Sequence, residues 1–106
     1  MAFVKALAKS ELQPGQGRCV KVNDKAIALF LIEGQYYAID ELCTHADASL
    51  ADGPAYKDEK GRCVVECPWH GAQFDLKTGA AVTLPAVTPV KSYPVRVEGD
   101  AIEIDV

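Results

Sequence analysis

The order of apolar and polar residues predicts a chain built from short β-strands. Ala26–Glu33 and Gln35–Asp40 are rich in apolar, aromatic and β-branched residues, which favour strands. The two runs are separated by Gly34, a residue typical of tight turns, so they are expected to form a hairpin. Many short strands divided by turn residues favour an all-β sandwich or barrel over a helical protein.

The end of the chain shows a second hairpin pattern. Lys91–Glu98 and Ala101–Val106 flank the turn residues Gly99 and Asp100. Apolar and charged residues alternate along both runs, so each strand is expected to have one buried face and one face in solvent. The apolar positions are Val95, Val97, Ile102 and Ile104, and the alternating charged positions are Arg96, Glu98, Glu103 and Asp105.

The stretch between these hairpins, residues 42–89, has a different composition. It is dense in Gly, Pro and Asp, and only Arg62–Glu66 and Ala72–Leu76 look like strands. Such long loops are uncommon in a compact domain unless they are functional or held by something other than backbone pairing. We therefore expect a single domain over residues 1–106. Residues 1–41 and 90–106 would form an antiparallel β sandwich or barrel, with 42–89 as an inserted, loop-rich subdomain.

The N-terminal dozen residues allow two interpretations. Phe3–Leu7 could form an edge strand, and Ala6–Leu12 could form a helical turn. Pro14 and Gly15 would end either element, because both residues interrupt regular structure. The pattern alone does not separate these alternatives.

Length and charge narrow the class of protein. A chain of 106 residues with 49% hydrophobic residues can bury one core unaided. The formal net charge of -4, with scattered Lys and Arg, argues against nucleic-acid binding. No apolar run of about 18 residues exists to span a membrane, and Lys5 and Lys9 interrupt any signal-peptide core. The expected location is therefore the cytoplasm.

The four cysteines fall into two kinds. Cys43 lies two residues before His45, Cys67 lies three residues before His70, and these are the only histidines in the chain. Cys19 and Cys63 instead lie in the strand-like runs RCVKV and RCVVE, where a free cysteine packs as a small apolar residue. In a reducing compartment, the two Cys-His pairs are better explained as ligands than as disulfide partners.

Two thiolates and two imidazoles suit either zinc or an iron-sulfur centre. Zinc fingers usually pair Cys with Cys and His with His, and place the histidines on one helix. Here each pair holds one Cys and one His, and Pro68 and Gly71 exclude a helix at the second pair. A structural zinc module remains an alternative that metal analysis would separate.

The two pairs, Cys-x-His and Cys-x-x-His, resemble the motif of the Rieske iron-sulfur family. The similarity continues through CPWHGAQFD, from Cys67 to Asp75, and extends over about Phe3–Val106. The resemblance implies one 2Fe-2S cluster, with two cysteines on the inner iron and two histidines on the outer iron. The ligands would be Cys43 and Cys67 on the inner iron and His45 and His70 on the outer iron.

Departures from the quinol-oxidising branch of the family indicate a different role. That branch carries two further cysteines that form a disulfide between the loops, and Ala48 and Trp69 stand at those positions here. The chain instead resembles the soluble ferredoxin component of bacterial oxygenases that hydroxylate aromatic rings. That resemblance implies a carrier without catalysis of its own, which takes one electron from a flavin-containing reductase and passes it to a terminal Rieske oxygenase. A small subunit of a larger oxidoreductase, similar to nitrite reductase small subunits, is the alternative.

Residues around the ligands suggest further roles. After the second histidine, the quinol-oxidising branch resembles Gly-Ser-x-Tyr, whose hydroxyls donate toward cluster sulfur. Ala72 and Phe74 replace both donors here, so a potential near the low end of the Rieske range, about -150 mV, is expected. Trp69 is either a contact for a redox partner or a packed residue, and Pro85 either covers the cluster or is a plain turn proline. Gly71 and Gly79 are expected in tight turns. Three loop carboxylates are either solvated or part of a docking surface: Asp47, Asp52 and Asp75.

Overall fold

The computed structural model describes residues 3–15, 17–41, 49–68, 72–83 and 89–105. Its strands form three antiparallel sheets, which confirms the all-β fold class. The first sheet has the order β1 (Phe3–Ala8), β11 (Ala101–Asp105), β10 (Val95–Glu98). The second has the order β2 (Gly17–Val22), β3 (Lys25–Ile32), β4 (Gln35–Asp40), β9 (Ser92–Tyr93). The third has the order β5 (Ala55–Lys57), β6 (Cys63–Glu66), β7 (Gln73–Asp75), β8 (Ala81–Thr83).

The hairpin predicted around Gly34 is present. Ile32 pairs with Gln35, so β3 and β4 are joined by the two residues Glu33 and Gly34. Both have positive φ, 49° and 80°, as a type I′ turn requires, and glycine adopts this conformation without a steric cost. At the N-terminus, the predicted edge strand forms β1, and the helical turn is the short 3-10 helix η1 (Lys9–Glu11) that follows it.

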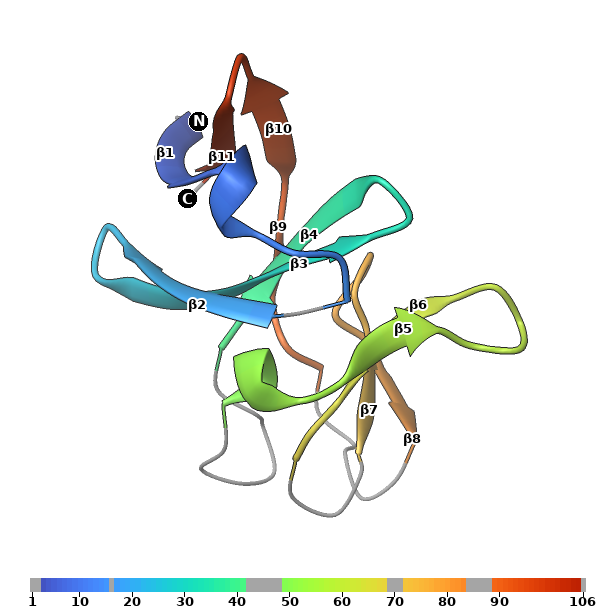
Figure 1. The fold of residues 1–106 in the computed structure, drawn as a ribbon. Coiled ribbons are helices and arrows are strands. Elements are labelled where there is room, and N and C mark those ends of the chain that lie inside the picture. The colour runs from blue at the N-terminus through green and yellow to red at the C-terminus, as the bar shows by residue number, and fades with distance from the viewer. Residues whose placement is uncertain (1–2, 16, 42–48, 69–71, 84–88, 106) are drawn as a thin grey trace.

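The second sheet lies between the first and third sheets (Figure 1). A hydrophobic core lies on each of its faces. Along β3, Ala28 and Phe30 belong to one core, whereas Ile27 and Leu29 belong to the other. Burial of both faces explains why this strand is apolar almost throughout, with no polar alternation. The first and third sheets cover the two faces and complete the two cores.

The run Lys91–Glu98, predicted as one strand, is divided at Pro94. The segment before it, β9, pairs with β4 of the second sheet, and the segment after it, β10, pairs with β11 of the first sheet. Pro94 has no backbone N–H to donate to a ladder, so a change of sheet at this position sacrifices no donor.

Val97 was expected on a buried face, and this prediction is wrong. Val97 lies opposite Ile102, whose side chain is fully buried, yet Val97 itself is 38% exposed. The physical reason is position in the sheet: β10 is an edge strand, and of its two valines only Val95 packs against the core.

The inserted region contains more regular structure than its composition predicted. The expected strands are β6 and β7, but β5 and β8 and the 3-10 helix η2 (Leu50–Asp52) were not predicted. β5 and β8 have three residues each, too few for a recognisable periodicity. Within the described ranges, the structure holds no helix long and apolar enough to cross a membrane.

Candidate metal centre

The predicted ligand Cys67 lies directly after β6, in the core between the second and third sheets. Cys67 is 1% exposed, and its backbone N–H donates to the carbonyl of Ala72 at 2.6 Å. This bond closes the short segment that holds His70. Cys43, His45 and His70 lie outside the described residues, together with Trp69, Gly71, Asp47 and Pro85.

The segment that holds Cys43 and His45 is closed at its base by Glu41. The backbone N–H of Leu50 donates to the Glu41 carbonyl at 2.7 Å, and the Ser49 hydroxyl donates to the Glu41 carboxylate at 3.0 Å. Leu50 is fully buried, which anchors the returning chain in the core. The ends of this ligand segment are therefore fixed by one backbone and one side-chain hydrogen bond.

The chain that follows the first predicted ligand segment lies against the chain that leads into the second. Glu66 donates its N–H to the Pro54 carbonyl at 2.9 Å, and Gly53 lies so close that an added Cβ would meet the Glu66 carbonyl oxygen at 1.8 Å. Only glycine fits such an approach. The chain that follows the Cys43–His45 pair, at Gly53 and Pro54, thus lies against the residue that precedes Cys67.

The third element at this end is the chain around Val90. Val90 donates to the Gly79 carbonyl at 2.9 Å, and a Cβ on Gly79 would lie 2.0 Å from the Val90 carbonyl oxygen. Gly79 has φ +81°, so the predicted tight turn is confirmed. Nearby, the Tyr93 hydroxyl donates to Asp40 at 2.6 Å, and burial together with this bond raises the pKa of Tyr93 to about 12.

The other two cysteines differ from each other. Cys63 is half-buried and packs against the core that holds Cys67. The pKa of Tyr37 is raised to about 12, chiefly by its hydrogen bond with Cys63 and then by the burial of Tyr37. Cys19 was predicted to be buried, and this is wrong, because it is exposed. β2 is the edge strand of its sheet, which leaves Cys19 at the rim beside Glu41. Partial desolvation, the hydrogen bond to Glu41 and the neighbouring acidic charges raise the pKa of Cys19 to about 11.

Among the carboxylates, Asp75 has a local structural role. Its side chain accepts hydrogen bonds from the backbone N–H groups of Lys77 and Thr78 and so shapes the turn between β7 and β8. Asp52 is exposed. In the described part of the chain, no three His, Cys, Asp or Glu side chains gather into a metal-binding group. Sequence reasoning missed the closing roles of Glu41 and Ser49, since no motif marks a hydrogen bond that joins the two ends of a loop.

Comparison with known protein families identifies the family to which this chain belongs. The sequence model of the Rieske [2Fe-2S] domain matches residues 2–94. The chain belongs to the Rieske family. Among curated relatives, this Rieske chain is 44% identical over 91 residues to the 3-phenylpropionate/cinnamic acid dioxygenase ferredoxin subunit of Escherichia coli strain K12, covering 85% of this chain and 82% of that one. It is 39% identical over 103 residues to the ferredoxin component of the naphthalene 1,2-dioxygenase system of Pseudomonas aeruginosa, covering 97% and 94%.

Several solved structures share the fold over nearly the whole chain. The ferredoxin of carbazole 1,9a-dioxygenase from Nocardioides aromaticivorans IC177 superposes with TM-score 0.88 at 33% identity, covering 98% of this chain and 97% of that one. A chain from a complex of reduced oxygenase and oxidised ferredoxin in carbazole 1,9a-dioxygenase gives TM-score 0.82 at 34% identity, covering 96% and 91%. A chain from Mycobacterium tuberculosis assigned as an NADH-dependent nitrite reductase small subunit gives TM-score 0.86 at 28% identity, covering 97% and 93%.

Proposed function

We propose that this Rieske chain carries single electrons from a flavin-containing ferredoxin reductase to a terminal Rieske oxygenase that acts on aromatic compounds. The observation that carries the proposal is its identity, at 39–44%, to ferredoxin components of aromatic dioxygenase systems over most of both chains. The chain's two histidines both belong to the ligand pairs, so this sequence has no further histidine for the oxygenase's own iron site. That supports a carrier rather than an enzyme.

The donor set fits the cluster that the family binds. We assign Cys43 and Cys67 to one iron and His45 and His70 to the other, because the motif places two thiolates and two imidazoles in neighbouring segments. Burial of Cys67 supports this assignment, since cluster sulfurs and their thiolate ligands are kept from water. When bound, the cluster supplies a one-electron redox centre whose charge is close to zero when oxidised, which eases reduction.

The first test is the composition and spectrum of the purified protein. We expect a red-brown protein with two irons and two acid-labile sulfides per chain and a Rieske-type paramagnetic signal after reduction. The reduced protein should then be reoxidised rapidly by a purified aromatic-ring dioxygenase, with a dioxygenase stripped of iron as control. Zinc in place of iron, or reduced protein without the signal, would refute the assignment.

The alternative is a small subunit of a larger oxidoreductase. The likeness to the chain assigned to a nitrite reductase favours it, because both chains have the same fold and nearly the same extent. Gel filtration of extract from the native host separates the two functions: a free carrier elutes at the size of a chain of 11.4 kDa or a small oligomer of it. Co-elution with a much larger oxidoreductase would favour the alternative.

A further inference from the structure

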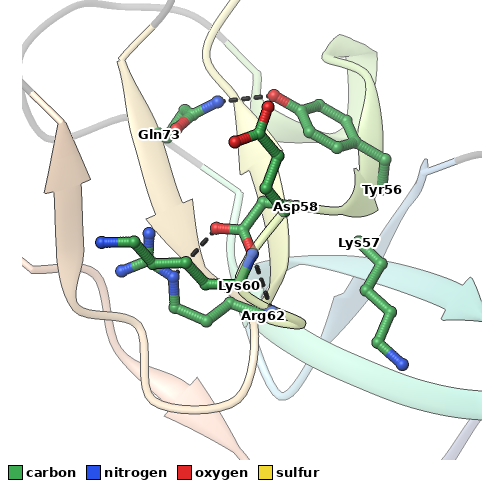
Figure 2. A pocket seen from close by; sticks show the side chains of 7 residues that line it. Tyr56, Lys57, Asp58, Lys60, Arg62 and Gln73 are labelled. Atoms are coloured by element: carbon green, nitrogen blue, oxygen red, sulfur yellow. Dashed lines mark hydrogen bonds and ion pairs between the residues drawn. The ribbon is translucent and has the colours of Figure 1, made fainter.

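Three polar side chains form a hydrogen-bonded bridge beside the second ligand segment. Tyr56 lies on β5, Glu66 ends β6 and Gln73 begins β7. The Tyr56 hydroxyl donates to the Glu66 carboxylate at 3.1 Å, and the Gln73 side-chain amide donates to the same hydroxyl. Figure 2 shows the Gln73 amide directed toward the Tyr56 hydroxyl. All three residues are half-buried.

The bridge spans the neck of the segment that contains Cys67 and His70. Glu66 and Gln73 are direct partners in the ladder between β6 and β7. Glu66 is therefore the last residue before the chain leaves the ladder, and Gln73 is the first after it returns. Just beyond them, Cys67 donates its N–H to Ala72. Tyr56 therefore connects both sides of this neck to a third strand through hydrogen bonds to side chains.

The surroundings of the Tyr56 hydroxyl favour its protonated form. Burial, followed by the hydrogen bond to Glu66 and its negative charge, raises the pKa of Tyr56, so the hydroxyl stays protonated and remains a donor. Glu66 is the residue before Cys67, and its carboxylate is held by Tyr56 at the neck of the segment that contains Cys67. A fixed negative charge at this place opposes the addition of an electron nearby.

We propose that Tyr56 is a positioning residue for the Cys67–His70 segment, and that the Glu66 carboxylate it orients lowers the reduction potential of the centre. This inference rests on the proposed function, because it requires a cluster at Cys67 and His70. Tyr56 acts through its hydrogen bonds with Glu66 and Gln73. Its role is thus to fix geometry, while Glu66 supplies charge.

The experiment compares holoprotein variants that separate geometry from charge. Tyr56→Phe removes the bridging hydroxyl, and Tyr36→Phe removes a hydroxyl on β4, away from the ligand segments. Glu66→Gln keeps an acceptor oxygen for Tyr56 but removes the charge. Arg62→Gln weakens the same β5–β6 hairpin at its far end, where Arg62 pairs with Asp58 at 2.9 Å. Each variant is assayed for midpoint potential, paramagnetic spectrum, rate of iron loss to a chelator, and melting temperature.

We expect Tyr56→Phe to alter the paramagnetic spectrum and to lose iron about three- to tenfold faster than wild type, the effect of about one hydrogen bond. Glu66→Gln should raise the midpoint potential with little change in iron loss, and Tyr36→Phe should match wild type. Gln73→Met, which removes the other half of the bridge, should change the spectrum and iron loss in the same direction as Tyr56→Phe.

Two results would overturn the inference. The first is a Tyr56→Phe protein with wild-type spectrum and iron loss. The second is equal loss of melting temperature in Tyr56→Phe and Arg62→Gln with no spectral change, since that is what a purely structural role in the hairpin predicts. A wild-type protein without a Rieske signal would overturn the proposed function as well, so the two failures are distinguishable.

Discussion

The two hydrophobic cores on either side of the second sheet are built from different parts of the chain. The base core lies toward β1, β10 and β11, and its fully buried side chains come from β3 and β11: Ile27, Leu29, Ile102 and Ile104. The site core lies toward the third sheet and includes Phe30, Leu50, Val65, Cys67 and Phe74. One core can therefore form without a cluster, whereas the other contains a predicted ligand.

The difference shows that the metal centre would be built into one of the two cores and not into the whole fold. In the site core, Cys67 packs among apolar neighbours, and Leu50 and Ala72 directly border the ligand segments. Loss of the centre should thus disturb this core first. The base core shares only the second sheet with it, and its other strands have no residue next to a ligand.

The largest expected effect follows from removing a ligand. His70→Ala should abolish the Rieske signal and leave iron content far below wild type, because one iron loses half of its protein ligands. Hydrogen exchange should then become fast in β6 and β7 while β1 and β11 stay protected. Uniform protection in both cores of the iron-free protein would contradict the division described above. His45→Ala should behave in the same way.

Truncation of one side chain in each core gives the next largest effect. Phe74→Ala should destabilise the protein by about 3–5 kcal/mol and Ile102→Ala by about 2–5 kcal/mol, since both side chains are fully buried. Denaturant unfolding measures these costs. The distinguishing readout is the midpoint potential of the folded variants: Phe74→Ala should shift it, because Phe74 shares a core with Cys67, and Ile102→Ala should not. Equal shifts in the two variants would contradict the separation.

A smaller effect is expected from adding hydroxyls to the site core. Ala72 and Phe74 are completely buried in the core that holds Cys67, and neither side chain can donate a hydrogen bond. Ala72→Ser combined with Phe74→Tyr should raise the midpoint potential by about 60–130 mV per hydroxyl, from a bond to a charged acceptor worth about 1.5–3 kcal/mol. The wild-type value should lie near about -150 mV. A wild-type midpoint above zero, or no rise in a double variant with intact cluster, would contradict the argument.

The smallest effects should come from the two cysteines outside the motif. Cys19→Ser should change the free energy of unfolding by less than about 0.5 kcal/mol, because Cys19 is exposed. Cys63→Ser should cost somewhat more, since Cys63 packs against the site core. Both variants should keep full iron content by metal analysis. Iron loss in Cys63→Ser would mean that the wrong thiolates have been assigned.

Much of the fold could be predicted because its signals are local. The run before Gly34 and the run after it define the hairpin by composition, and the alternation in Ala101–Val106 correctly marks Ile102 and Ile104 as buried. The same alternation places Asp105 in solvent, and this is wrong, because Asp105 is buried. The sheet change at Pro94, the exposure of Cys19 and the short strands β5 and β8 could not be predicted. They depend on which strand lies at an edge and on pairings between segments distant in sequence, which periodicity does not record.

The sequence predicts the ligand motif of the site, but not the residues that hold the ligand-bearing segments in place. Two Cys-His pairs identify the family without a structure, whereas the assignment of Cys43, His45, Cys67 and His70 as ligands stays a prediction. The residues that hold the segments, such as Glu41 and Tyr56, carry no signature of their own. Their partners, Ser49 and Glu66, are 8 and 10 residues away, so only the folded backbone brings them together.

The close approach of Gly53 to Glu66 limits how this centre could be transplanted. Gly53 leaves no room for a Cβ against the Glu66 carbonyl, so the chain after the first predicted ligand segment fits against the residue before Cys67 through backbone and not through adaptable side chains. A protein engineer who grafts only the Cys43–His45 segment onto another β-scaffold would leave behind the surface that it fits. The unit that can be inherited, swapped or grafted intact is therefore the pair of segments together with the strands that carry them.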